Sequence, residues 1–298
     1  MKIGFIGLGR MGGRMVSLLL EKKHKVVLYA RHPKSMNPFI KKSAIGTKSF
    51  EEFSKKLGKE KIALLMVPHG NPTDEVIAGI EPFFSKGDII IDGGNSYYKD
   101  SIERGKTLAK KGIYFLDVGT SGGLLGAMNG ASIMVGGNKK AFKKAEPIFK
   151  SLAMKNGYEY MGHSGAGHFV KMVHNGIEYA WLQSLGEGFR ILEKSDYNLD
   201  LRKVTKIYKN GSVIRSWLMD LLYDAMQKDP KLKKQSGVVG GGSTGNWTLK
   251  TAREMNLDFE TLEVAMNARE KSFKNPDFSG KVVAALRFGF GGHIPPKK

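Results

Sequence analysis

Short apolar runs, many of them β-branched, alternate with helix-patterned stretches through the first half of the chain. Strands that alternate with helices at this spacing predict βαβ units and a parallel sheet. Helical patterns lie between most of the runs, for example over Met11–Glu21 and Glu51–Leu57. The predicted strands are Lys2–Ile6, Val26–Tyr29, Ile62–Val67, Ile89–Asp92, Tyr114–Asp117 and Ile133–Val135.

The strand pattern fades near Gly162, and from Ala166 onward the periodicity is helical without strong strand signals. The glycine-rich segment Ser236–Ser243 predicts a loop within this helical part, either a hinge or a place where backbone approaches a ligand. The predicted helices are Ala166–Lys194, Leu201–Tyr208, Val213–Met226, Trp247–Glu254, Phe259–Lys271 and Lys281–Phe288.

Composition narrows the class of protein. The chain has 298 residues, which suggests about two domains, and 41% hydrophobic residues, which is enough for a core. The absence of cysteine excludes disulfides, thiolate nucleophiles and Cys-ligated metals, and no histidine pair has H-E-x-x-H spacing, so no metal site is predicted. No apolar run approaches the roughly 18 residues of a membrane span, and no signal peptide is evident. We expect a soluble, cytoplasmic protein with no membrane partner.

The charge is unusually positive, because 48 Lys and Arg against 28 Asp and Glu give +20. Such a surplus attracts anions, including nucleic acids and phosphorylated metabolites, although a solvated lysine-rich surface explains it equally well. No zinc finger, aromatic RNP box or GXXG clamp accompanies the charge, so no nucleic-acid partner is expected. The opposite hypothesis, a nucleotide sensor or nucleic-acid-binding protein, predicts steeply salt-dependent binding.

The first predicted strand runs into Gly7-Leu8-Gly9-Arg10-Met11-Gly12, which matches G-x-G-x-x-G and opens a helix. In this context the motif predicts a dinucleotide site, with phosphates at the helix N-terminus. The alternative is a glycine turn without a ligand. The expected fold is therefore an α/β Rossmann-like parallel-sheet domain over residues 1–163, followed by an all-α domain over residues 164–298.

The end of the second predicted strand bears on which dinucleotide binds. An NAD-binding domain usually has an acidic residue there for the ribose hydroxyls, but this chain has Ala30, Arg31 and His32. The guanidinium of Arg31 can bind a 2′-phosphate, which predicts NADP over NAD, with NAD still possible. The alternative is that Arg31 only stacks on the adenine.

The predicted helix from Ala166 carries a polar stripe of Lys171, His174, Asn175 and Glu178, at positions i, i+3, i+4 and i+7. Its other positions are mostly apolar, so we expect it to be buried nearly all round except for this stripe. A desolvated lysine can act as a base, and a nearby glutamate that is kept protonated can donate a proton. The alternative is an ordinary ion-pair network on a core helix.

Three segments resemble the 6-phosphogluconate dehydrogenases, the decarboxylating members of the β-hydroxyacid dehydrogenases. They are residues 165–179, residues 90–96 and residues 117–123, and at this length the chain is similar to the family's short form. Two of the segments place Asn95 and Ser121-Gly122-Gly123 just past predicted parallel strands, where open α/β sheets bind ligands. An amide, a hydroxyl and bare backbone N–H groups suit a sugar acid.

The resemblance implies oxidation and decarboxylation of 6-phospho-D-gluconate to D-ribulose 5-phosphate, in gluconate metabolism and the pentose phosphate pathway. By resemblance, Lys171 takes the proton of the C3 hydroxyl and Glu178 aids protonation of the enediol, without a metal. The residues expected to orient the substrate are Asn95, Ser121, Gly122, Gly123, His174 and Asn175. The nicotinamide side is expected to involve Val67, Pro68, His69 and Asn95.

The substrate phosphate is expected, by resemblance, on Tyr179, Arg269 and Arg287. The run from Arg287 to His293 matches the family's tail, which reaches a neighbouring subunit's site, so a homodimer or homotetramer is implied; the alternative is a frayed basic tail. Gly242 and Asn246 replace two lysines of the long form, which leaves Thr244 beside the two arginines as phosphate ligands. A 3-hydroxyisobutyrate-type dehydrogenase is the alternative enzyme, since it shares the glycine motif and the lysine.

Overall fold

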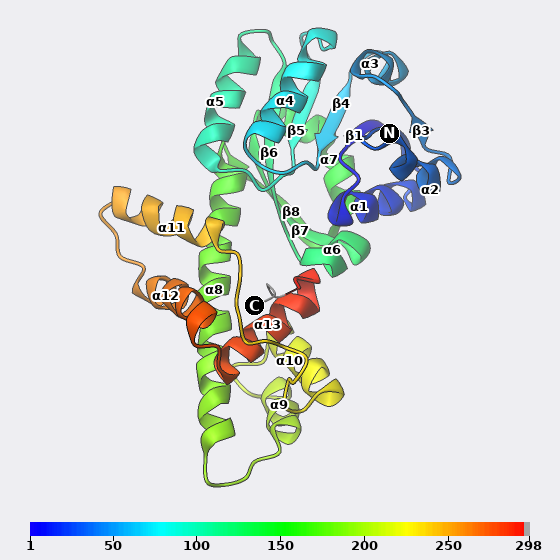
Figure 1. Cartoon of the computed structure of the whole chain (residues 1–298). Helices are drawn as coiled ribbons and strands as arrows, with labels where there is room; N and C mark the ends of the chain where they lie inside the picture. The colour runs from blue at the N-terminus through cyan, green and yellow to red at the C-terminus, as the bar shows by residue number, and fades with distance from the viewer. Residues whose placement is uncertain (295–298) are drawn as a thin grey trace. The chain divides into compact units, whose positions relative to one another are not determined.

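The computed structural model describes residues 1–294. The chain forms two compact units, Met1–Met172 and a second that begins at Val173, and the division falls inside the long helix α8 (Ala166–Lys194). The first unit is α/β and the second is helical (Figure 1). The expected Rossmann-like sheet followed by a helical region is confirmed.

One eight-stranded sheet forms the first unit, in the order β3-β2-β1-β4-β5-β6-β7-β8. Its central strands are nearly continuous apolar runs, as expected for parallel strands that are covered on both faces. The strands are β1 (Lys2–Ile6), β2 (Lys25–Tyr29), β3 (Ile45–Gly46), β4 (Ile62–Leu65), β5 (Ile89–Asp92), β6 (Tyr114–Ser121), β7 (Ala131–Gly137) and β8 (Ala153–Gly162).

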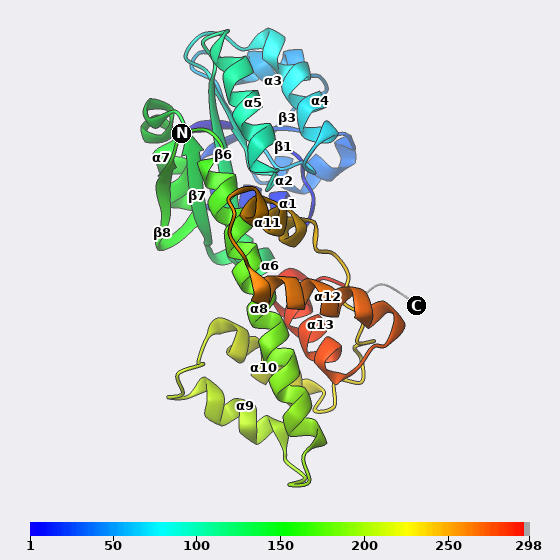
Figure 2. The same ribbon diagram turned by 90° about the vertical axis from the view of Figure 1, so that its left-hand side faces the viewer.

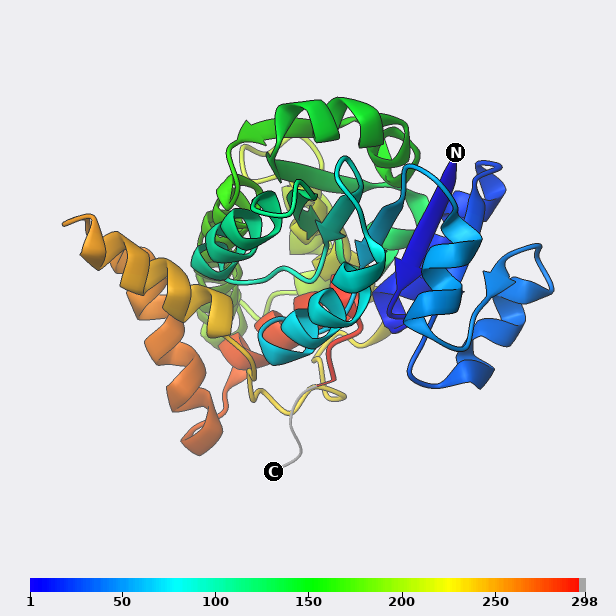
Figure 3. The same ribbon diagram turned by 90° about the horizontal axis from the view of Figure 1, so that it is seen from above.

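Alternate side chains of each strand enter two separate cores. Ile3 and Phe5 of β1 lie in the core beneath α1, α6 and α7, whereas Ile6 lies in the core beneath α3, α4 and α5. Figure 3 shows helices on both sides of the sheet. The helices and short 3-10 turns of this unit are α1 (Arg10–Glu21), η1 (Pro33–Met36), α2 (Asn37–Ile40), α3 (Phe50–Leu57), α4 (Asn71–Ile80), η2 (Glu81–Phe83), α5 (Tyr98–Ala109), α6 (Gly123–Asn129) and α7 (Lys139–Leu152).

The sheet departs from parallel order at its last two strands, because β7 is antiparallel to β6 and β8 runs parallel to β7. The connection from Gly122 to Gly130 is shorter than the roughly dozen residues that a parallel crossover requires. The strand pattern also missed β3 and β8. The first has only two residues, and the second carries many exposed polar side chains at the edge of the sheet, which is typical of edge strands.

The second unit packs its helices around the part of α8 that follows Val173. Leu182, Leu185 and Phe189 of α8 share a core with Met219 and Leu222 of α10, and Figure 2 shows α9 and α10 beside that end of α8. The remaining helices are α9 (Leu201–Lys209), α10 (Trp217–Lys228), α11 (Ser243–Glu254), α12 (Glu260–Lys274) and α13 (Phe278–Gly291).

Helix α8 itself has the predicted bounds, but the expectation that it is buried nearly all round is wrong. Ile177, Trp181 and Ile191 are 54%, 41% and 72% exposed. The other helices of this chain therefore leave part of the apolar surface of α8 uncovered.

Helix α10 begins four residues later than predicted, because the Ser216 hydroxyl accepts from the N–H of Met219 and caps the helix there. No helix within residues 1–294 is long and apolar enough to cross a membrane.

Candidate active site

The glycine motif forms an open cradle between β1 and α1. Gly7 has φ +100°, and a Cβ there would collide with the carbonyl oxygen of Met66. A Cβ on Gly12 would collide with the carbonyl of Gly7, whereas one on Gly9 would meet nothing within 4 Å. Helix α1 has no side-chain cap and no acidic residue in its first turn. Its N-terminal N–H groups therefore suit the phosphates of a dinucleotide.

The residues predicted to choose the cofactor follow β2. Ala30 is buried, while the Arg31 side chain is 80% exposed and the neighbouring His32 is exposed. A guanidinium nitrogen of Arg31 lies 3.9 Å from a carboxylate oxygen of Glu75, on α4. At this exposure the ion pair is weak, so Arg31 can turn to another anion at little cost.

Two predicted loops lie at the carboxyl ends of β4 and β5. Val67, Pro68 and His69 follow β4, and the last two are exposed. Asn95 follows β5 with φ 51°, and its amide accepts from the N–H of Thr120 at 2.9 Å and donates to the carbonyl of Thr120 at 3.3 Å. An Asn amide can make four hydrogen bonds, so Asn95 can hold the end of β6 and still contact a ligand.

Lys171 lies in the first part of α8 and is only 6% exposed. It packs against β6 at Gly119, where a Cβ would collide with the Lys171 Cβ. The absence of a side chain at Gly119 thus lets this turn of α8 approach the strand. The same strand ends at Ser121 and continues into Gly122 and Gly123, so three predicted substrate residues follow the point where β6 contacts the helix.

The rest of the polar stripe continues along α8 in the second unit. His174 Nδ1 lies 3.2 Å from Asn175 Oδ1 and 3.8 Å from Glu178 Oε2. The Glu178 side chain is 20% exposed. Asn175 Nδ2 also donates to the Thr244 hydroxyl at 3.3 Å. The stripe is therefore a hydrogen-bonded group that retains access to solvent.

A cluster of cationic and hydroxyl side chains surrounds Tyr179 in the second unit. The Tyr179 hydroxyl lies 3.1 Å from that of Thr244, and the Arg269 guanidinium lies 3.8 Å from the centre of the Tyr179 ring. The charge of Arg287 interacts with both Arg269 and Tyr179. The structure thus brings the predicted phosphate residues Tyr179, Thr244, Arg269 and Arg287 into one cluster.

The two arginines of this cluster are held in an unusual electrostatic state. Burial, reinforced by the charge of Arg287, lowers the pKa of Arg269 to about 10, and burial also lowers the pKa of Arg287. Arg269 is 3% exposed, and its Nη2 has no hydrogen-bond partner within residues 1–294. A buried cation with an unsatisfied donor favours an anionic partner, so this cluster is a candidate anion site.

The tail residue His293 lies against its own helix, with its ring 6.0 Å from that of Phe290 in an edge-on arrangement. The final residues of the predicted tail, 295–298, lie outside the described part of the chain.

Within residues 1–294 no group of three or more His, Asp or Glu side chains is arranged to hold a metal ion.

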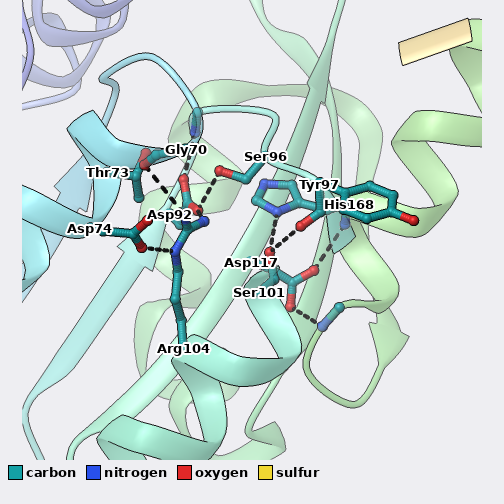
Figure 4. Close-up of polar contacts among 12 residues, drawn as sticks. Gly70, Thr73, Asp74, Asp92, Ser96, Tyr97, Ser101, Arg104, Asp117 and His168 are labelled. Atoms are coloured by element: carbon teal, nitrogen blue, oxygen red, sulfur yellow. Dashed lines mark hydrogen bonds and ion pairs between the residues drawn. The ribbon is translucent and has the colours of Figure 1, made fainter. Parts of the chain in front are cut away.

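The sequence pattern missed a buried polar network that supports these loops (Figure 4). Asp117, in β6, accepts from the N–H of Gly165 at 2.7 Å and from that of His168 at 2.9 Å, which fixes the first turn of α8. Arg104, on α5, pairs with Asp92 at 3.1 Å. The available signal was that Asp92 and Asp117 end the apolar runs predicted as strands, Ile89–Asp92 and Tyr114–Asp117, where a buried carboxylate must find a partner.

Comparison with known proteins agrees with this architecture. Residues 2–162 match the NAD binding domain of 6-phosphogluconate dehydrogenase, and residues 167–195 match that enzyme's C-terminal domain. The chain is 44% identical to YqeC of Bacillus subtilis (strain 168), a provisionally named 6-phosphogluconate dehydrogenase, over 100% of both chains. It is 38% identical to the NAD(+)-dependent, decarboxylating 6-phosphogluconate dehydrogenase of Haloferax volcanii, over 100% of this chain and 99% of the other.

Among solved structures, Plasmodium falciparum 6-phosphogluconate dehydrogenase superimposes with a TM-score of 0.84 at 30% identity, over 97% of this chain and 70% of that one. That protein was solved in its apo form, with NADP+ and with 6-phosphogluconate. The length and identity of these matches, together with the glycine cradle and the sheet, decide the family. The chain belongs to the 6-phosphogluconate dehydrogenase family of NAD-binding oxidoreductases.

Proposed function

We propose that this chain oxidatively decarboxylates 6-phospho-D-gluconate to D-ribulose 5-phosphate and CO2 with reduction of NADP, as a step of the pentose phosphate pathway. The observation that carries the proposal is the clustering of the buried Arg269 and the half-buried Arg287 with Tyr179. Tyr179 lies eight residues after Lys171 on the same helix, roughly 12 Å along its axis. One helix thus carries both the proposed base and a wall of the proposed phosphate site.

Lys171 is proposed as the general base, since buried lysines are the type that enzymes use in this role. Its Nζ takes the proton of the C3 hydroxyl. NADP, when bound, would accept the hydride that leaves C3. Lys171 then returns the proton to the new C3 carbonyl as CO2 leaves, because the electron pair of the broken C1–C2 bond moves toward that carbonyl. Glu178 donates a proton to C2 of the resulting enediol, which becomes C1 of the product, while Lys171 again takes the proton of the C3 hydroxyl so that the ketone forms.

The remaining site residues are proposed to bind and orient the substrate. Asn95, Ser121, Gly122 and Gly123 suit the carboxylate and hydroxyl end, and His174 and Asn175 suit the hydroxyls near C3. His293 is proposed to contact the phosphate end from the tail. We further propose a homodimer or homotetramer, which the exposed apolar side chains Ile177, Val264 and Phe273 support.

The decisive experiment measures turnover of 6-phosphogluconate, gluconate and 3-hydroxyisobutyrate with each cofactor, following reduced cofactor and CO2 together. We expect equal amounts of both products from 6-phosphogluconate and little turnover of the other acids. A 3-hydroxyisobutyrate-type enzyme would instead oxidise its substrate without CO2 release. Turnover of an unphosphorylated acid, with none of 6-phosphogluconate, would overturn the proposal.

NADP preference is expected to depend on Arg31. We expect Arg31→Ala to lower kcat/KM for NADP by about 10-fold, the effect of one charge-assisted contact at an exposed site, and to leave the value for NAD unchanged. Glu75→Gln should move the NADP to NAD ratio upward, because it removes the carboxylate that lies 3.9 Å from Arg31. If Arg31 only stacks on adenine, Arg31→Ala will weaken both cofactors alike.

A further inference from the structure

Helix α5 carries two buried polar side chains on one face, Ser101 and Arg104, which are three residues apart. Ser101 is fully buried and Arg104 is 7% exposed. Neither belongs to a predicted site. Figure 4 shows that they point to different segments, Arg104 toward Asp74 and Asp92, and Ser101 toward His168.

Arg104 connects the segments that follow β4 and β5. Its Nε donates to Asp74 at 2.7 Å, its Nη1 donates to Asp92 at 3.1 Å, and its Nη2 donates to the carbonyl of Gly70 at 3.4 Å. Gly70 directly follows the Val67–His69 loop. A single guanidinium therefore holds the base of that loop and the end of β5 together.

Asp92 extends this connection to the loop that carries Asn95. It is fully buried, and besides Arg104 it accepts from the N–H of Gly94 at 2.9 Å and from the Ser96 hydroxyl at 2.8 Å. Both neighbours of Asn95 are thus fixed by one carboxylate. The left-handed backbone of Asn95, at φ 51°, is kept in place between them.

The other end of the α5 face contacts the helix of Lys171. Ser101 Oγ lies 2.8 Å from His168 Nδ1, and His168 lies one turn before Lys171. His168 is fully buried, and its Nε2 has no hydrogen-bond partner within residues 1–294. Ser101 therefore anchors this ring, while Asp117 holds its backbone.

The electrostatics of Arg104 indicate that its contacts fix the positions of the groups they join more than they stabilise the fold. Burial alone would lower the pKa of Arg104, but its hydrogen bond to Asp74 and the charge of Asp92 outweigh burial and raise that pKa. Arg104 is therefore a permanent cation. Buried ion pairs add little net stability compared with apolar packing, yet their directional bonds fix the groups they join.

We propose that Arg104 is a positioning residue, which holds the Val67–His69 loop and the Asn95 loop in one arrangement and so aligns cofactor and substrate for hydride transfer. This inference rests on the proposed function. Hydride transfer is sensitive to alignment, and a displacement of about 1 Å can cost roughly 100-fold in rate. Arg104 acts through the loops without touching the reacting atoms.

The test is Arg104→Lys, which keeps a cation beside Asp92 but replaces the planar guanidinium, whose three nitrogens donate to Asp74, Asp92 and Gly70, with a single nitrogen. Arg253→Met is the matched control, because it removes an arginine from an exposed ion pair with Glu263. We expect Arg104→Lys to lower kcat by about 10- to 100-fold, with a larger isotope effect for C3-deuterated substrate, and to leave the Kd for NADP and the Tm close to wild type. The control should change none of these.

Hydrogen exchange supplies a readout that does not depend on the substrate. In Arg104→Lys we expect faster exchange in peptides covering residues 67–70 and 93–96, and unchanged exchange in α7. Wild-type kcat in this variant, or unchanged exchange in both loops, would overturn the inference. If the wild-type enzyme does not turn over 6-phosphogluconate, the proposed function fails, and the exchange data still decide whether Arg104 holds the loops.

Discussion

Replacing Lys171 with methionine is expected to lower kcat for 6-phosphogluconate by about 10²- to 10⁴-fold, the usual contribution of a positioned general base. Methionine is unbranched and fills similar space, so it preserves the contact with Gly119 on β6. The glycine cradle lies elsewhere in the first unit, so the Kd for NADP should stay at its wild-type value. Steady-state kinetics and cofactor-fluorescence titration measure the two effects separately.

Lys194→Met is the matched control for this variant. Lys194 ends the same helix, and its side chain is 75% exposed. We expect this control to keep wild-type kcat and KM. Retained turnover in Lys171→Met would remove Lys171 from the role of base. Loss of NADP binding together with turnover would instead indicate that Lys171 supports the fold of the cofactor domain.

The parts of this fold that sequence alone predicts are those with a local cause. Buried strands such as Ile89–Asp92 show as apolar runs, and the cradle shows as a glycine pattern after a strand. Helix α8 has its predicted bounds because its periodicity continues from Ala166 to Lys194 without interruption. In each case, neighbouring residues determine the structure.

What the sequence did not predict depends on distant partners. The reversal of β7 follows from the length of a connection, and β8 forms only because β7 offers it an edge. The pairing of Arg104 with Asp92 and Asp74 joins α5 to the end of β5 and to the first turn of α4, which only the folded sheet brings together. The exposed Ile177 could not be anticipated, since the pattern shows which side chains are apolar but not what covers them.

The polar stripe of α8 has some contacts that the sequence predicts and one that it does not. Helical spacing alone places His174, Asn175 and Glu178 within reach of one another, and the contacts between them agree. The stripe's further partner, Thr244, lies far along the chain and was expected only as a phosphate ligand. Its hydrogen bonds to Asn175 and Tyr179 link the stripe to the cluster of Tyr179, Arg269 and Arg287.

Replacing Arg269 with methionine is expected to raise KM for 6-phosphogluconate by about 10- to 100-fold, because each hydrogen bond between charged groups contributes about 1.5–3 kcal/mol. Arg269→Lys should recover only part of this loss, because an ammonium cannot bind phosphate through two parallel bonds. Arg253→Met, in an exposed pair, is the control and should leave KM unchanged. An unchanged KM in Arg269→Met would place the phosphate elsewhere.

The same substitution should stabilise the ligand-free protein. Because folding lowers the pKa of Arg269 to about 10, the charged form costs about 3 kcal/mol in the folded chain. This cost is fully present below pH 10, where Arg269 is protonated in both states, and it disappears as the pH rises through the higher pKa that Arg269 has in the unfolded chain. Loss of the contact with Tyr179 offsets about 1–2 kcal/mol of the gain.

At neutral pH we therefore expect a higher Tm for ligand-free Arg269→Met than for wild type. Inorganic phosphate should reverse the order, since it can neutralise Arg269 in the wild-type cluster and stabilise only the protein that binds it. Thermal unfolding with and without phosphate measures both effects. A lower Tm for the ligand-free variant, or an equal response of both proteins to phosphate, would show that Arg269 is a structural cation and not an anion ligand.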